Sequence, residues 1–289
     1  MSAVAAGPLA GAARARPDGW LAQPLGTDPA TATEQARTLL ALHHPDVVGP
    51  VRCLTARYRS ATFAVGHPPH AIFKWHADEA AYLGERLAYD LLAAEQVVPA
   101  LRGSCDESRT LLVGYLPDAA DLADLDLFDD LIGAVVRVHT ASARWNRTVR
   151  EAMARWRTAA ALAGDPPWVD DPSAWRRMLL LVAAAHGPAH VPLGNLDLAA
   201  DHVRRHPDGR LALVDVETLR PDVTGLPDVV TLAYLAAQAG HAHPGPWVRA
   251  RYVRHLRQAG VNWADRDLIA AFTNFAEATG LTSLHGLDH

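Results

Sequence analysis

Residues 193–217 read LGNLDLAADHVRRHPDGRLALVDVE, and the fold can be argued outward from this stretch. A polar loop comes first and carries Asp197 and His202. Two short runs, 203–205 and 211–214, then flank the letters HPDG, a pattern typical of a β-hairpin. Asp215 follows the second run, so the sequence predicts two carboxylates whose separation a hairpin holds fixed.

The same stretch resembles a motif of the aminoglycoside phosphotransferase and choline kinase-like family. That motif is His-Gly-Asp-Leu, three variable residues, Asn, a hairpin and then Ile-Asp-Trp-Glu. Asp197 matches the catalytic Asp, His202 stands where the family has a metal-binding Asn, and Asp215 matches the metal-binding Asp. The resemblance covers about residues 45–260. It implies a two-lobed protein-kinase-like fold of the α+β class, with a small β-rich N-lobe and a larger helical C-lobe.

The motif departs from the family pattern at four positions. Asn195 and Leu196 replace the His and the Gly before the catalytic Asp, His202 replaces the metal-binding Asn, and Val216 replaces the Trp. An alternative register aligns Leu193-Gly194-Asn195 with His-Gly-Asp. It keeps the glycine, but it loses the base and puts Ala200 at the metal position. The register through Asp197 is preferred because it preserves both spacings.

His202 leaves three alternatives open. An amide oxygen suits Mg²⁺, a hard ion, whereas an imidazole nitrogen suits softer metals. In the first, His202 binds a softer metal such as Mn²⁺ beside Asp215. In the second, it turns away and leaves Mg²⁺ to Asp215, with Glu217, water and the phosphates as further ligands. In the third, the metal site is lost. The second alternative is preferred, because Asp215 and nucleotide phosphates can hold one Mg²⁺ without the imidazole.

Lys74 is the only lysine among 27 basic residues. It ends the short apolar run Ala71-Ile72-Phe73-Lys74, which resembles the Val-Ala-Ile-Lys strand of kinase-like folds. The resemblance implies that Lys74 binds nucleotide phosphates and pairs with a glutamate on the next helix. Glu85 is the preferred partner and Glu79 the alternative.

The resemblance also implies further contacts with a nucleotide. The loop Arg57-Tyr58-Arg59-Ser60 would lie over the phosphates, although it lacks the glycines usual there. The segment Val113-Gly114-Tyr115-Leu116 would be the hinge whose backbone meets adenine. The implied cofactors are ATP or GTP, with Mg²⁺ or Mn²⁺.

Composition sets the outer limits of the interpretation. The chain has 289 residues, 49% of them hydrophobic, and a net charge of −5. That balance argues against a general nucleic-acid binder, since neutralising phosphates needs a basic face. We expect no membrane span and no secretory signal, and two cysteines favour a reducing cytoplasm. The predicted organisation is a loose tail at 1–18, an N-lobe at 19–116 and a C-lobe at 117–289.

Periodicity and turn residues predict the elements along the chain. A capping box at Thr31–Glu34 opens a helix that Pro45 ends, and Asp171 caps a later one. The predicted strands are 53–65, 71–75 and 110–116, besides the hairpin. The predicted helices after the second strand are 78–94, 125–143, 147–162, 172–185, 226–239, 247–258 and 263–278.

These observations predict a phosphotransferase. It would move the γ-phosphate of the nucleotide to a hydroxyl of a small molecule, such as an antibiotic or a natural-product intermediate, or to a Ser or Thr of a biosynthetic peptide. The alternative is a catalytically degenerate kinase-like protein that binds a peptide or protein partner.

Overall fold

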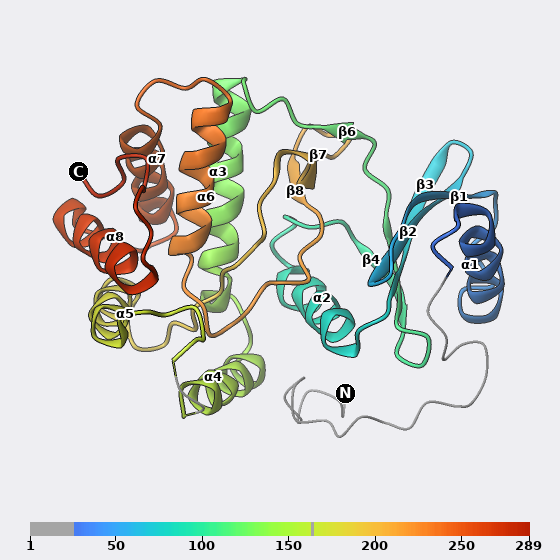
Figure 1. Ribbon diagram of the computed structural model, residues 1–289, viewed down its shortest axis with the longest axis horizontal. Helices are drawn as coiled ribbons and strands as arrows, with labels where there is room; N and C mark the ends of the chain where they lie inside the picture. The colour runs from blue at the N-terminus through green and yellow to red at the C-terminus, as the bar shows by residue number, and fades with distance from the viewer. Residues whose placement is uncertain (1–25, 163–164) are drawn as a thin grey trace. The chain divides into compact units, whose positions relative to one another are not determined.

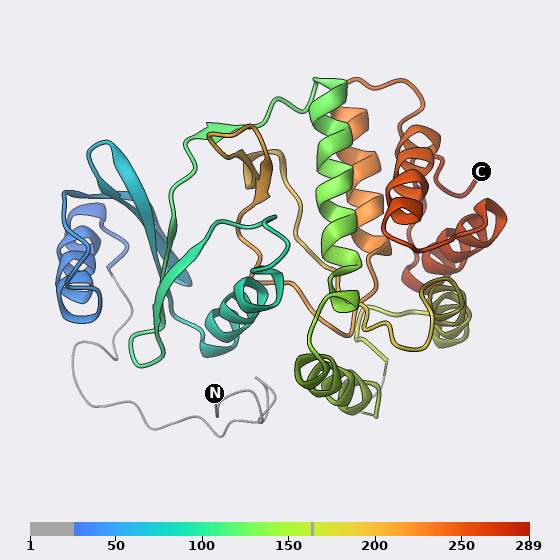
Figure 2. The ribbon, with the colours of Figure 1, turned by 180° about the vertical axis from the view of Figure 1, so that it is seen from behind.

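The computed structural model describes residues 26–162 and 165–289, so the predicted tail at 1–18 lies outside the described residues. The described chain forms two compact units (Figures 1 and 2). The first holds residues 26–117 and Val214–Thr218, and the second holds Asp118–Leu213 and Leu219–His289. An antiparallel sheet dominates the first unit and helices dominate the second, so the predicted α+β class is confirmed.

The first unit is built on one five-stranded antiparallel sheet. Its strand order is β1-β2-β3-β5-β4, and α2 connects β3 to β4 along the chain. The elements are α1 (Pro29–His43), β1 (Val51–Ala56), β2 (Ser60–Gly66), β3 (Pro69–His76), α2 (Glu79–Leu92), β4 (Leu101–Cys105) and β5 (Thr110–Gly114).

The two faces of β3 have different neighbours. Side chains alternate along a strand, so Phe73 and Trp75 point to one face and Lys74 and His76 to the other. Phe73 and Trp75 belong to a buried cluster that includes Leu39 and its neighbours on α1. Figures 1 and 2 show α1 and α2 on opposite sides of the sheet. The apolar face therefore packs on α1, and the face with Lys74 is turned toward α2.

Two features of the sheet differ from the prediction. The single strand expected over 53–65 is wrong, because the chain turns at Arg57 and the Arg57 N–H donates to the carbonyl of Ser60 at 2.9 Å. Residues 57–59 are exposed and polar, so no buried face holds them extended. The edge strand β4 was not predicted, because pairing with β5 defines it and its own sequence, LRGSC, has little apolar periodicity.

The second unit contains six α-helices among its described residues. Helix α3 packs on both α6 and α7, and α5 packs on α8. A three-stranded sheet of order β6-β7-β8 carries the predicted hairpin as β7 and β8. The elements are β6 (Asp118–Ala119), α3 (Leu125–His139), η3 (Ala141–Ala143), α4 (Arg147–Leu162), α5 (Pro172–His186), η4 (Ala200–His202), β7 (Val203–Arg205), β8 (Leu211–Leu213), α6 (Leu226–Gln238), α7 (Pro244–Gln258) and α8 (Asp265–Thr279).

Aspartates begin four of the helices. The carboxylates of Asp28, Asp78, Asp124 and Asp171 accept hydrogen bonds from backbone N–H groups of the first turn. The predicted cap at Asp171 is confirmed, but the capping box at Thr31–Glu34 is wrong. Asp28 caps α1 instead, because an aspartate followed by proline satisfies the free N–H groups one turn earlier.

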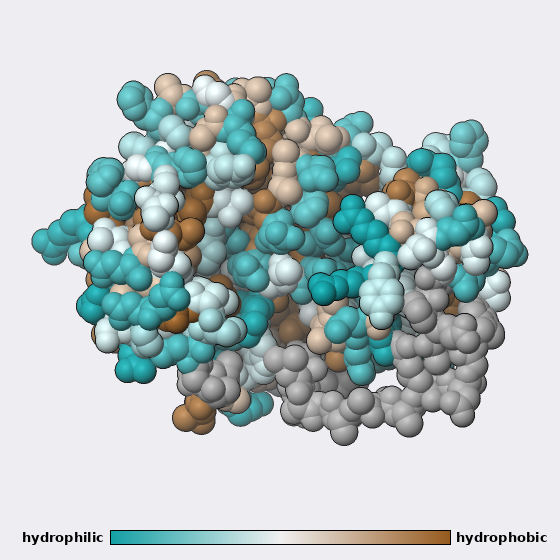
Figure 3. Space-filling view, viewed as in Figure 1, coloured by the Kyte–Doolittle hydropathy of each residue, from teal (hydrophilic) through white to brown (hydrophobic). Residues whose placement is uncertain are grey.

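Hydrophilic and intermediate side chains cover most of the face drawn in Figure 3, with hydrophobic ones between them. Among the described residues, no helix is both long and apolar enough to cross a lipid bilayer.

Candidate functional site

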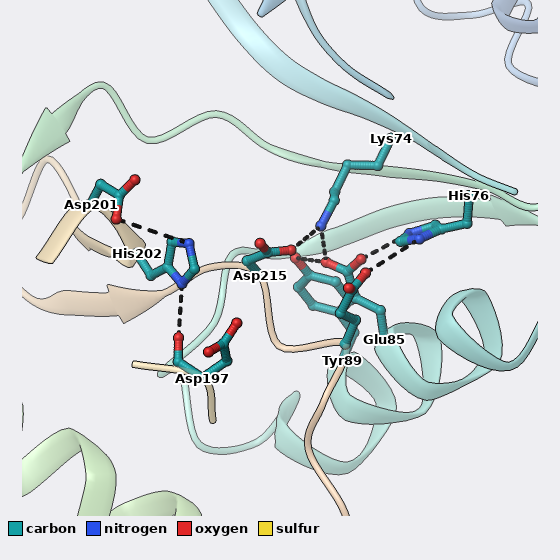
Figure 4. Close-up of polar contacts among 9 residues, drawn as sticks. Lys74, His76, Glu85, Tyr89, Asp197, Asp201, His202 and Asp215 are labelled. Carbon is teal, nitrogen blue, oxygen red and sulfur yellow. Dashed lines mark hydrogen bonds and ion pairs between the residues drawn. The ribbon is translucent and has the colours of Figure 1, made fainter. Parts of the chain in front are cut away.

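Lys74 is at the centre of a buried charge cluster in the first unit (Figure 4). Its ammonium Nζ lies 2.7 Å from Oε1 of Glu85 and 2.9 Å from Oδ1 of Asp215. Only 8% of Lys74 is exposed, and Glu85 is fully buried. Glu79, the alternative partner, lies in the exposed first turn of α2. The structure thus pairs the single lysine with Glu85 and brings Asp215 to the same ammonium.

The ionisation of the pair follows from its surroundings. Burial by itself raises the pKa of Glu85, but Lys74 and His76 outweigh it and hold that pKa at about 2. Burial by itself lowers the pKa of Lys74, but Glu85 and Asp215 outweigh it and raise that pKa above its ordinary value. Both groups are therefore charged at neutral pH.

Helix α2 brings Glu85 into place through a close backbone approach. A Cβ atom added at Gly84 would lie 2.8 Å from the carbonyl oxygen of Glu217, so only glycine fits there without a shift. One turn after Glu85, the Tyr89 hydroxyl donates to Oε1 of Glu85 at 3.4 Å. The helix is thus held directly against the segment that carries Asp215.

Asp215 lies in the short segment Val214–Thr218, which the structure groups with the first unit. Its φ of 62° is in the left-handed region, which aspartate tolerates better than most residues. Val216, at the position of the family's Trp, is fully buried, while the Asp215 side chain is 42% exposed. The buried valine anchors the segment and the carboxylate beside it is accessible. Lys74 and Asp215 were expected on opposite lobes, but they share one unit.

His76 and Glu217 complete the cluster. His76 is fully buried, with Nε2 2.9 Å from Oε2 of Glu85 and Nδ1 3.5 Å from Oε2 of Glu217. Burial and the neighbouring Asp215 raise the pKa of Glu217. Three carboxylates and two basic side chains therefore share one site.

In the second unit, the predicted catalytic loop presents Asp197 to solvent. Leu196 and Leu198 on either side are buried, and Asp197 is exposed. Both Asn195 (φ 69°) and Asp197 (φ 49°) have left-handed backbone. The alternation of buried leucines with Asp197 leaves the aspartate side chain exposed.

The side chain of Asp228 holds this loop through hydrogen bonds. Its buried carboxylate accepts the backbone N–H of Asn195 at 3.0 Å and that of Leu196 at 2.8 Å. Its Oδ2 also lies 2.9 Å from Nε2 of His139, whose Nδ1 lies 2.9 Å from the Tyr252 hydroxyl. Asp228, which lies in the predicted helix 226–239, thus also anchors the loop.

His202 is bound to the loop that precedes it. Its Nδ1 lies 2.9 Å from the carbonyl oxygen of Asp197 and donates to it, and its Nε2 lies 4.0 Å from Asp201 (Figure 4). The ring therefore braces the backbone of Asp197. Asp197 and His202 belong to the second unit and Asp215 to the first. A metal site shared by Asp215 and His202 therefore stays a prediction.

The remaining predicted nucleotide contacts are placed as follows. Ser60 begins β2 and is paired in register with His76. Val113 is buried inside β5, and the N–H of Tyr115 donates to the carbonyl of His70 at 3.2 Å. The expected hinge thus begins within the sheet, and the roles of these residues toward a nucleotide stay predictions.

Comparisons with known proteins match the chain only through structure. No family model matches it, and no curated protein does. A choline/ethanolamine kinase family protein from Mesorhizobium loti is 15% identical with a TM-score of 0.49, over 85% of this chain and 82% of that one. APH(2")-IIia, in its complex with GDP and kanamycin, is 16% identical with a TM-score of 0.48, over 83% and 87%. The choline kinase LicA from Streptococcus pneumoniae is 13% identical with a TM-score of 0.47, over 84% and 90%.

The chain resembles choline kinase-like proteins and aminoglycoside phosphotransferases. This is the resemblance that its motifs predict. Because these identities are low, the comparisons bear on the fold, and any chemistry has to be argued from the residues of the site.

Sequence reasoning missed His76, and it named Glu217 only as a further ligand of Mg²⁺ beside Asp215. Their signals were available: His76 is two positions after Lys74 on the same strand face, and Glu217 is two positions after Asp215. Either side chain joins the site because α2 passes close to the segment that carries Asp215, and only the folded chain shows that approach.

Proposed function

We propose that the protein is a phosphotransferase that moves the γ-phosphoryl group of ATP or GTP to a hydroxyl group. The observation that supports this most directly is the contact of Lys74 with both Glu85 and Asp215. A single buried lysine held by a helix carboxylate and a partly exposed carboxylate is suited to bind phosphate oxygens and a metal side by side.

Phosphoryl transfer requires positioning of the reactants and neutralisation of the phosphate charge more than it requires covalent catalysis. Lys74 supplies a fixed cation for the phosphates, and Glu85 orients it. Asp197 would accept the proton of the attacking hydroxyl as a general base. Ser60, Val113 and Tyr115 are proposed to line the rest of the nucleotide site.

A divalent cation fits the residues on one side of this site. Asp215 offers carboxylate oxygens on a partly exposed side chain, the hard donors that Mg²⁺ prefers. The His202 imidazole is a softer donor and already braces the Asp197 carbonyl. We therefore assign Asp215 as the residue that would hold Mg²⁺, which neutralises phosphate charge when bound, and His202 as a ligand only for a softer ion such as Mn²⁺.

The acceptor is proposed to be a small molecule, such as an antibiotic or a natural-product intermediate, or a Ser or Thr of a biosynthetic peptide. In solved structures that the chain resembles, bound molecules include GDP with kanamycin and streptomycin with ATP. These nucleotides and amino sugars are accordingly the first compounds to test.

The decisive experiment is calorimetric titration of the full chain with ATP and GTP, in Mg²⁺ and then in Mn²⁺. We expect binding that the Lys74→Met variant weakens by at least about tenfold, since a charge-assisted contact with phosphate is lost. An acceptor panel of amino sugars, macrolides and Ser/Thr peptides then follows, with a mass gain of one phosphoryl group as the signal. If the chain binds neither nucleotide in Mg²⁺ or in Mn²⁺, the proposal is wrong.

A second candidate function is a kinase-like protein without catalysis. The replacements at Asn195, Leu196 and His202, where the family has His, Gly and Asn, favour it. Nucleotide binding without transfer to any acceptor, and retention of a peptide or protein partner on the immobilised chain, would support this alternative.

A further inference from the structure

The buried imidazole of His76 has a role that the proposed phosphotransfer chemistry does not by itself require. Lys74 and His76 lie two positions apart on β3, so their side chains leave the same face of the strand. They reach different oxygens of one carboxylate: Lys74 contacts Oε1 of Glu85 at 2.7 Å, and His76 contacts Oε2 at 2.9 Å. Each oxygen of the Glu85 carboxylate thus has its own basic neighbour.

The other side of the ring faces a second carboxylate. Nδ1 of His76 lies 3.5 Å from Oε2 of Glu217, in the segment Val214–Thr218 that also carries Asp215. Helix α2 passes this segment at Gly84, with room for no side chain. The imidazole therefore lies between two elements that must keep their spacing for Lys74 to meet Glu85 and Asp215 together.

A metal ion is the competing explanation for this cluster. Ligand atoms of His76, Glu85 and Glu217 all lie within 4.8 Å of one another. A metal, however, is bound through one imidazole nitrogen, whereas here each nitrogen faces a different carboxylate. Neither nitrogen is aligned for a hydrogen bond with any described residue, and neither is Oε2 of Glu85. The ring is therefore placed by its two close contacts with carboxylates, at 2.9 Å and 3.5 Å.

We infer that His76 is a positioning residue: it bridges Glu85 and Glu217, and so holds the carboxylate of α2 in register with Lys74 and with the segment of Asp215. Without the imidazole, the buried Oε2 of Glu85 would lose its contact with a basic side chain. Glu85 would then rotate, and Lys74 would lose its oriented partner. The consequence for nucleotide binding rests on the proposed function, but the consequence for Lys74 does not.

The test uses the fact that Lys74 is the only lysine of the chain. An amine-acylating reagent modifies Lys74 and the α-amino group alone, and mass spectrometry of the peptide that carries Lys74 gives its labelling rate. We expect His76→Ala to raise that rate several-fold, because a loosened pair exposes the amine. The matched control is His70→Ala, which removes an exposed histidine from the same strand and should leave the rate unchanged.

Two conservative variants separate bridging from mere space filling. Glutamine carries its amide at about the reach of Nε2 and can still donate to Glu85, whereas asparagine reaches only the position of Nδ1. We expect His76→Gln to keep the labelling rate near that of the native chain and His76→Asn to resemble His76→Ala. In calorimetry, the alanine and asparagine variants should bind ATP about tenfold more weakly, the factor that one lost charge-assisted hydrogen bond produces.

The outcomes are distinguishable. If the native chain binds no nucleotide, the proposed function fails, while the labelling series still tests the role of His76. If His76→Gln labels as fast as His76→Ala, or if none of the variants changes the rate, the positioning role is wrong. If the native chain binds one Zn²⁺ and His76→Ala does not, His76 is a metal ligand and the inference is overturned.

Discussion

The ammonium of Lys74 lies 2.9 Å from the carboxylate of Asp215, although 141 positions separate the two residues in the chain. The first is predicted to bind phosphates and the second a metal. Their contact means that each is a counter-ion of the other. On the proposed function, nucleotide binding would exchange this ion pair for phosphate and metal contacts and would not expose a bare charge.

Loss of Lys74 should reduce both stability and binding. Lys74→Met leaves Glu85 buried without its cation, which we expect to lower the free energy of unfolding by about 3–5 kcal/mol. The double variant Lys74→Met/Glu85→Gln should recover most of that loss, as urea unfolding can measure, but should not recover nucleotide binding. Lys74→Arg should bind poorly, because the guanidinium is wider and planar. Full binding by the arginine variant would show that the lone lysine has no special role.

Asp197 is expected to act as the general base. Asp197→Asn should leave melting and nucleotide affinity close to native, and should lower the transfer rate by at least about 10²-fold. Asn195→Ala is the matched control, because Asn195 lies in the same loop and its backbone N–H bond to Asp228 is retained. The opposite ranking of the two variants would favour the alternative register, in which Asn195 stands at the catalytic position.

His202 is expected to brace the loop and not to bind Mg²⁺. His202→Ala should retain activity with Mg²⁺, lowered by no more than about tenfold, since one hydrogen bond to the Asp197 carbonyl is lost. His202→Asn should restore or improve it. The measurement is the transfer rate with Mg²⁺ and with Mn²⁺ in parallel. Loss of all activity in His202→Asn, with a native chain active only in Mn²⁺, would instead make His202 a metal ligand.

The charge of Asp228 should matter more to the loop than to the rest of the fold. Asp228→Asn keeps the shape but removes a charged acceptor from two backbone N–H groups, which we expect to cost about 1–3 kcal/mol of stability. The transfer rate should fall while nucleotide affinity stays near native, because the loop belongs to the second unit. Hydrogen exchange at Asn195 and Leu196 should accelerate, and unchanged exchange there would contradict the anchoring role.

Stability should fall on acidification in two overlapping windows. His186 and His190 stack with ring centroids 4.1 Å apart, and burial lowers the pKa of His186 to about 4 and that of His190 to about 2. Their ordinary value is 6.5, so the unfolded chain binds more protons below it. Stability should decline from about pH 6.5 toward pH 4 through His186, and on toward pH 2 through His190. Glu85 keeps its contribution above its ordinary 4.5 and loses it only as the pH falls toward 2.

Thermal unfolding across this range tests the assignment. The His190→Gln variant should flatten the decline from pH 6.5 downward, most clearly between pH 6.5 and 4.5, where Glu85 does not contribute. Glu85→Gln should affect only the lower window. A native-like decline in the His190 variant would mean that other groups cause it.

Much of the architecture could be predicted from the sequence, for reasons visible in particular elements. The hairpin was predicted because HPDG is a local turn signal, and α5 because Asp171 and Pro172 mark its start. The sheet was predicted less well: β4 is defined by its pairing with β5, and the turn at residues 57–59 divides the segment 53–65 that was predicted as one strand. Local signals are in the sequence, whereas pairing partners are set by the fold.

The residues of the site show the same difference between local signals and contacts set by the fold. Lys74, Glu85 and Asp215 were predicted through spacing and resemblance, and the structure brings all three together. The spacing of His76 to Lys74 indicates a shared strand face but names no partner, and Asp228 is in the sequence only one residue of the predicted helix 226–239. Both act through contacts with residues far along the chain, His76 with Glu217 and Asp228 with Asn195.

The grouping of Val214–Thr218 with the first unit has a consequence for how the chain is made. Lys74 and Glu85 leave the ribosome long before Asp215, and at about 5–20 residues per second the delay is roughly 7–28 s. During that interval the nascent sheet holds its lysine without the second carboxylate. The first unit can mature only when most of the second has been translated. A fragment that stops at Pro117 would lack Asp215 however well its sheet folds.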